Sequence, residues 1–133
     1  MPALDSLITM GGPASSDWVI PEGDNVALDF SVLLNDVAVN LTDVTGTCSI
    51  RADYDAAADL VAGVVTFPTP LTGSVRVTLT AANSTTLAGA APAGTPAGQR
   101  LVPVGYFDVE LQDGTNQVTV LAGVAIVSRE ATP

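Results

Sequence analysis

The stretch GYFDVELQDGTNQVTVLAGVAIVS, residues 105–128, decides the fold. Its first part alternates apolar and polar side chains, the pattern of a strand that buries one face. The apolar set is Phe107, Val109 and Leu111. Asp113-Gly114 then supplies residues that tolerate the positive φ of tight hairpin turns. A second apolar run follows, so the stretch predicts a β-hairpin with no catalytic signature.

The rest of the chain repeats short strand signals between turn residues. We predict strands over residues 17–20, 26–34, 37–41, 45–52, 60–67 and 73–80, and one helical turn within 81–87. Val and Thr are abundant, and no long helical period is present. About seven short strands with regular turn signals predict an all-β, immunoglobulin-like β-sandwich. A small β-barrel is the competing architecture.

Two segments fall outside the strand pattern. Residues 1–16 contain scattered apolar side chains but are broken by Gly11-Gly12-Pro13 and Ser15-Ser16, which predicts an N-terminal arm before a sandwich domain at 17–133. Residues 88–103, AGAAPAGTPAGQRLVP, predict a long insertion loop within that domain. Arm and loop have little charge, so we expect them to lie on partner surfaces. The expected partner contacts are Leu4, Leu7, Ile8, Arg100, Leu101 and the outward-facing Tyr106.

The charge balance restricts the partners. The chain of 133 residues has 14 acidic residues, four arginines and no lysine or histidine, for a net charge of −10. This charge repels phosphate backbones and anionic lipid surfaces, so we expect neither nucleic-acid nor membrane binding. No apolar run reaches the roughly 20 residues that span a bilayer, and the N-terminus lacks the basic region of a secretory signal.

Few residues can carry chemistry. Without histidine or lysine, acid–base catalysis falls to carboxylates, and the most visible pair, Asp108 and Glu110, fits the solvated face of a strand. The single cysteine, Cys48, alternates in phase with Ile50 and is expected to be buried. We therefore expect no enzymatic activity.

The acidic loop at 51–59 offers the best candidate metal ligands, Asp53, Asp55 and Asp59. Their spacing resembles part of a calcium loop, but the glycine and the distal glutamate of such loops are absent. A solvated turn explains the loop better, so no metal or other cofactor is expected. Trp18 and Tyr54 are candidate sugar-stacking aromatics, although core packing is the expected use of Trp18.

The order of short motifs carries a family resemblance. The chain presents, in sequence, Gly23-Asp24, Leu41-Thr42, Ser49-Ile50-Arg51, Gly73 before Val75-Arg76-Val77-Thr78-Leu79-Thr80, Gly105-Tyr106-Phe107-Asp108-Val109-Glu110-Leu111, Asp113-Gly114, Leu121-Ala122-Gly123 and Glu130-Ala131-Thr132. This succession resembles the small immunoglobulin-like virion domain at the start of phage baseplate upper proteins and in related short phage structural proteins. It departs from that family in its long connection at 88–103 and in the first sixteen residues, which lie outside the match.

The resemblance implies a non-enzymatic virion protein that docks through strand edges, arm and loop. No receptor-binding region follows the matched domain, so the expected role is a tail or baseplate adaptor that joins fibres or spikes. The expected partners are other phage structural proteins and further copies of the chain. A head decoration (cement) protein that stabilises the capsid lattice is the first alternative. A carbohydrate-binding module is the second.

Overall fold

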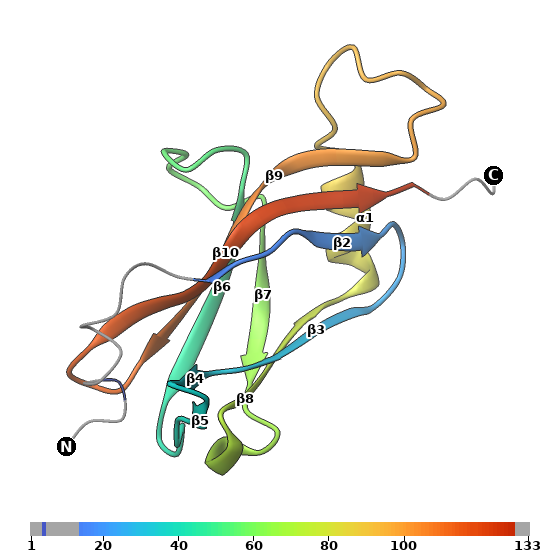
Figure 1. Cartoon of the computed structure of the whole chain (residues 1–133). Coiled ribbons are helices and arrows are strands. Elements are labelled where there is room, and N and C mark those ends of the chain that lie inside the picture. Colours follow the sequence, from blue (N-terminus) through green and yellow to red (C-terminus); the bar gives the residue numbers. More distant parts are fainter. Residues whose placement is uncertain (1–3, 5–13, 130–133) are drawn as a thin grey trace.

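The computed structural model describes Leu4 and residues 14–129. Its longest elements are β9 (Leu101–Gln112) and β10 (Gln117–Ser128), which pair antiparallel (Figure 1). This confirms the predicted hairpin. Asp113 Oδ1 accepts hydrogen bonds from the backbone N–H groups of Thr115 (2.9 Å) and Asn116 (2.7 Å), which fixes the turn. β9 begins four residues before the hairpin predicted from the sequence.

One sheet is built around this hairpin. β6 (Thr45–Arg51) pairs antiparallel with β9 on one side. On the other side, β1 (Ala14–Ser15) and β2 (Trp18–Pro21) both pair parallel with β10. The predicted arm at 1–16 is therefore too long. Its residues 14 and 15 form β1 and belong to the sheet.

The second sheet contains β3 (Val26–Ser31) and β8 (Ser74–Leu79), which pair antiparallel. β7 (Val61–Thr66) joins the two sheets, because its first half pairs with β6 and its second half pairs with β8. The strand order begins with β1 and β2 and ends with β3. In the described part of the chain, β3 does not pair with β1 or β2. The result is a curled immunoglobulin-like β-sandwich, as predicted, and not a closed barrel.

Short elements complete the ends of the sandwich. α1 (Ala81–Ala88) confirms the predicted helical turn; the Thr80 side chain accepts a hydrogen bond from the Asn83 N–H (3.1 Å) and caps it. At the opposite end lie a small hairpin of β4 (Leu33–Leu34) and β5 (Val37–Ala38) and the 3-10 helix η1 (Pro70–Thr72) (Figure 1). None of the described helices is long and apolar enough to cross a membrane.

The core lies between the two sheets. The inward residues of the predicted hairpin, Phe107, Val109 and Leu111, are buried, and Trp18 meets Phe107 edge-on with ring centroids 5.5 Å apart. Trp18 is therefore a core residue and not a sugar platform. Cys48 is buried as expected, and burial followed by the nearby Asp108 charge raises the pKa of its thiol to about 12. Such a thiol is a packing group and not a nucleophile at neutral pH.

Candidate docking face

The outer face of the first sheet follows from strand alternation. Residues of β2, β10, β9 and β6 that point away from the core share this face, which we call the outer face. Its members are Val19 on β2, Val124 and Ile126 on β10, Leu101, Pro103, Tyr106, Asp108 and Glu110 on β9, and Ser49 and Arg51 on β6. The face is apolar near the start of β9 and acidic near its end.

Two tyrosines form the centre of this face. The ring of Tyr54, from the loop after β6, stacks on that of Tyr106 with centroids 4.3 Å apart and an interplanar angle of 24°. Tyr54 is 63% exposed. The stack borders a shallow hollow that is lined by Ser49, Arg51, Asp53, Tyr54, Tyr106, Phe107 and Asp108. An exposed aromatic pair beside polar groups is typical of a protein-binding surface.

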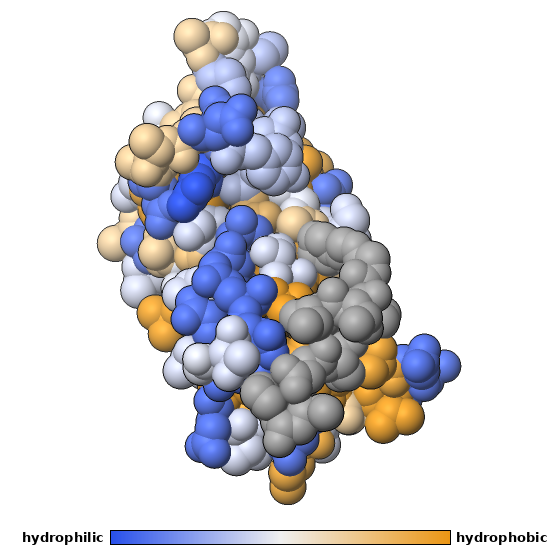
Figure 2. Space-filling view, turned by 90° about the vertical axis from the view of Figure 1, so that its left-hand side faces the viewer, coloured by the Kyte–Doolittle hydropathy of each residue, from blue (hydrophilic) through white to orange (hydrophobic). Residues whose placement is uncertain are grey.

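The surroundings of the stack carry excess negative charge. Arg51 donates from Nε to Asp59 Oδ1 at 2.8 Å, so this arginine is already paired. Partial burial, followed by the charge of Glu110, raises the pKa of Asp108. Figure 2 shows hydrophilic residues gathered on the side from which the loop of Tyr54 projects. We call the surface formed by Asp53, Tyr54, Tyr106, Asp108 and Glu110 the aromatic–acidic surface.

The three candidate metal ligands do not converge. Asp53 Oδ1 accepts the backbone N–H of Asp55 (3.1 Å), as in a local turn, while Asp59 pairs with Arg51. Within the part of the chain that the structure describes, no group of three or more acidic, cysteine or histidine side chains could hold a metal ion. Asp53 and Asp59 thus make local contacts within the loop and its base.

The carboxylates weighed as a catalytic pair both lie on the outer face. Asp108 stands opposite Ser49 and Ala122, and Glu110 stands opposite Thr47 and Thr119. Glu110 accepts a hydrogen bond from the side-chain amide of Gln117. Both residues lie in β9 where it is paired with β6 on one side and with β10 on the other, as is typical of residues on a strand face.

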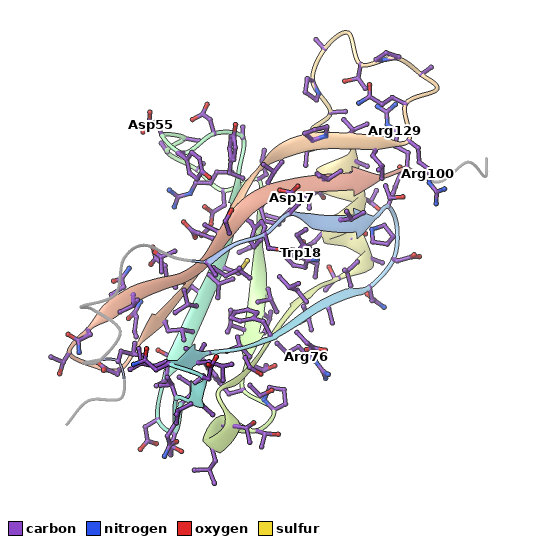
Figure 3. The ribbon with its side chains drawn as sticks, viewed as in Figure 1. Asp17, Trp18, Asp55, Arg76, Arg100 and Arg129 are labelled. Carbon is purple, nitrogen blue, oxygen red and sulfur yellow. The ribbon has the colours of Figure 1, made fainter. Side chains whose placement is uncertain are left out.

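Two arginines lie beside each other where β9 begins and β10 ends. Arg100 precedes β9, and its carbonyl oxygen accepts the backbone N–H of Arg129 at 2.8 Å. The Arg129 guanidinium donates from Nη1 to the Pro96 carbonyl oxygen at 3.3 Å. Figure 3 shows Arg100 and Arg129 together at one end of the β9–β10 ribbon, Asp17 nearer its middle, and Asp55 apart from them on a projecting loop. We call the surface formed by Arg100, Leu101 and Arg129 the arginine end.

The loop that was predicted over 88–103 spans residues 89–100, because residue 88 ends α1 and Leu101 begins β9. It projects beyond the sheet (Figure 1). Local turns shape it: the backbone N–H of Thr95 donates to the Pro92 carbonyl (3.2 Å), and that of Gln99 donates to the Pro96 carbonyl (3.0 Å). The loop is therefore folded on itself between the strands that anchor it.

The expected partner contacts divide into three groups. Arg100 and Leu101 are exposed, Leu101 by 51%, and Tyr106 is half-buried beneath Tyr54. Leu4 is fully buried in the core of its own chain, where its N–H donates to Asp113 Oδ2 at 2.9 Å, so it is not a surface for a partner. Leu7 and Ile8 lie outside the described residues.

Sequence reasoning missed Val19 and Arg129. Val19 is 47% exposed between the buried Trp18 and Ile20, so the period of two could have placed it on the outer face. Arg129 lies just beyond β10, and only the pairing with the residues before β9 brings it beside Arg100. No local signal in the sequence reveals that neighbourhood.

Comparisons with known proteins find solved structures of similar fold but no related sequence. No protein-family model matches the chain, and no curated protein matches it either. One similar solved structure is the ZIG-8–RIG-5 IG1–IG1 heterodimer, with 14% identity, 90% of this chain and 87% of that chain covered, and a TM-score of 0.44. Another is the extracellular domain of the voltage-gated sodium channel beta4 subunit, solved as a parallel homodimer, with 7% identity, 91% and 97% covered, and a TM-score of 0.42.

Proposed function

We propose that this chain is a non-enzymatic structural protein of a phage virion, a tail or baseplate adaptor that docks fibres or spikes. The proposal rests on the ordered motifs that resemble the phage virion domain and on a sandwich whose exposed features suit docking. The observation that carries it is the projecting loop at 89–100, which is almost free of charge and is anchored between α1 and β9.

Docking by such a molecule is geometric. The sandwich supplies a rigid base, since its core residues span both sheets. The loop and the outer face supply apolar and aromatic area, including Leu101, Tyr54 and Val19. Burial of this area provides the affinity, and the self-folded loop loses little conformational entropy when it docks. Many copies in a symmetric particle then reinforce one another.

Copy number tests the proposal. Virions of the phage or prophage that encodes the chain are purified, and the chain is quantified against the major capsid protein by mass spectrometry. An adaptor is present in about six to a few dozen copies, as tail symmetry requires. Hundreds of copies contradict the adaptor role and identify a head decoration protein. Absence from purified virions contradicts both structural roles.

A loop replacement tests which part docks. Residues 92–99 are replaced by a short Gly-Ser linker, which retains Arg100, all of β9 and α1, and the core contacts of Ala90 and Ala91. We expect loss of the chain from virions with unchanged thermal unfolding of the purified protein. The matched control is Val37→Ser, which removes an exposed apolar side chain at the opposite end of the molecule. Normal incorporation of the loop variant contradicts a docking role for the loop.

The exposed ring of Tyr54 favours one second candidate, a carbohydrate-binding module. A glycan array with the purified chain tests it, with Tyr54→Ala as the comparison. Binding that Tyr54→Ala abolishes supports the carbohydrate role, and an array without binding removes it.

A further inference from the structure

We propose that copies of this chain associate head to tail, with the arginine end of one copy docked on the aromatic–acidic surface of the next. The inference rests on the proposed docking function and names the partner of the same face, which is a second copy of the chain. The two surfaces are different patches of one molecule, so the contact is heterologous and generates a ring or an open filament.

Among the described residues, no ion pair engages the cations of the arginine end. The ion pairs among residues 14–129 use Arg51 with Asp59 and Arg76 with Asp29. Arg100 is exposed, and the guanidinium of Arg129 contacts a carbonyl oxygen. Leu101, next to Arg100, adds an apolar contact, since half of its surface is exposed. Such an end matches a surface that offers carboxylates and an aromatic ring.

The aromatic–acidic surface supplies those groups. Asp53 and Asp55 are exposed in the loop beside Tyr54, and Asp108 and Glu110 follow along β9. Arg51, the cation of the same neighbourhood, is already engaged by Asp59. The stacked pair leaves one face of Tyr54 open, where a guanidinium gains from the ring quadrupole as well as from the carboxylates.

The geometry prevents a copy from satisfying itself. Arg100 lies before the start of β9, whereas Asp108 and Glu110 lie near its other end. At a strand rise of roughly 3.3 Å per residue, the distance from Leu101 to Asp108 is about 23 Å, well beyond a direct contact. Figure 3 shows the labelled arginines at one end of the ribbon and Asp55 well apart from them, on a projecting loop. Complementary charges that cannot meet within one chain can meet between two chains.

The net charge of −10 opposes this contact at long range. At physiological ionic strength the Debye length is about 8 Å, so repulsion between whole copies is largely screened while the close contact persists. The contact is therefore expected at about 0.15 M salt, with weakening toward 1 M as direct ion pairs are screened as well.

Sedimentation velocity on the purified chain tests the proposal with two complementary variants. Arg100→Gln/Arg129→Gln removes the cations. Asp53→Asn/Asp108→Asn removes two negative charges from the receiving surface while it retains hydrogen-bond acceptors. We expect the unmodified chain to form species larger than a dimer as its concentration rises. Each variant alone stays monomeric. Their equimolar mixture stops at a one-to-one dimer, because each variant retains one intact surface.

Asp36→Asn/Asp43→Asn is the matched control for the acidic variant. Both positions have positive φ, which Asn tolerates, and both lie outside the two surfaces, so the net charge changes equally without touching the contact. The control should assemble as the unmodified chain does. Circular dichroism verifies that every variant is folded. If the acidic variant is unfolded, Tyr54→Ala takes its place as the variant of the receiving surface.

Two results would overturn the inference: an unmodified chain that stays monomeric at every concentration, or a variant mixture without dimers. A chain that stays monomeric yet is present in virions contradicts the head-to-tail contact alone. A chain that assembles yet is absent from virions contradicts the proposed function alone.

Discussion

Gly123 lies directly against the carbonyl oxygen of Ser16: a Cβ atom at residue 123 would stand 1.6 Å from that oxygen. The close approach lets the segment between β1 and β2 run along β10, where the Ser16 N–H donates to the Ala122 carbonyl at 3.0 Å. The glycine is thus needed for backbone proximity and not for a turn.

Gly123→Ala is therefore expected to force the N-terminal strands away from β10. The loss of stability should be about 3 kcal/mol, the upper end of what overpacking typically costs. Chemical denaturation of both proteins gives the difference. Gly98→Ala is the control, because nothing lies within 4 Å of a Cβ at that position. Equal losses in the two variants would contradict the steric explanation.

Phe107→Ala is expected to remove the central aromatic contact of the core. Phe107 is buried and meets Trp18 edge-on, so the variant should lose about 3–5 kcal/mol, which could unfold a marginally stable domain. Urea unfolding monitored by Trp18 fluorescence measures the change. Leu101→Ala, at an exposed position of the same strand, should have little effect on stability. A small effect at Phe107 would mean that the core is not packed as described.

Protonation of the Asp113 carboxyl is expected to lower the stability of the fold in acid. Desolvation would raise the pKa of its carboxyl, but hydrogen bonds from Asn116, Leu4 and Thr115 outweigh it and lower the pKa to about 2. The unfolded value is about 3.9, so this contribution is complete above pH 4 and is lost as the pH falls toward 2. Asp113→Ala should be less stable than the unmodified chain at pH 7. Denaturation at pH 7 and pH 2.5 should show this difference shrinking in acid.

Ionisation of Asp108 should have the opposite effect on stability from ionisation of Asp113. Its pKa is raised, so the folded chain binds a proton there more readily than the unfolded chain does, and the ionised group weakens the fold at pH 7. Asp108→Asn should therefore be more stable at pH 7, with an advantage that shrinks as the pH falls through the folded pKa. Thermal unfolding between pH 7 and pH 4 measures it. Asp55→Asn, in the exposed loop, serves as the comparison and should show no such gain.

Local periodicity was enough to predict the fold class. The alternation around Phe107 and Val109 and the turn at Asp113 specify a hairpin without long-range information. The start of β9 was missed although Val102 and Val104 alternate in the same way, because the preceding Ala, Gly and Pro residues resemble a continuing loop. The helical turn predicted within 81–87 is one residue shorter than α1, which runs from Ala81 to Ala88.

The candidate site depends on contacts between distant residues, so the sequence predicted less of it. Tyr54 meets Tyr106, and Arg129 reaches Arg100, only because β6, β9 and β10 are neighbours in the sheet. The prediction of Leu4 as a partner contact is wrong because its burial depends on the distant hairpin turn at Asp113. Strand order and burial of this kind arise from tertiary packing, which a pattern of local residues does not encode.

The passage of β7 from β6 to β8 has a mechanical consequence. At Gly63, where a Cβ would come within 2.8 Å of Val77, one backbone belongs first to one sheet and then to the other. A pull applied to the outer face therefore reaches the second sheet through covalent bonds and ladder hydrogen bonds. Tension applied to one layer is therefore shared with the other, and the two layers cannot slide freely on their apolar interface.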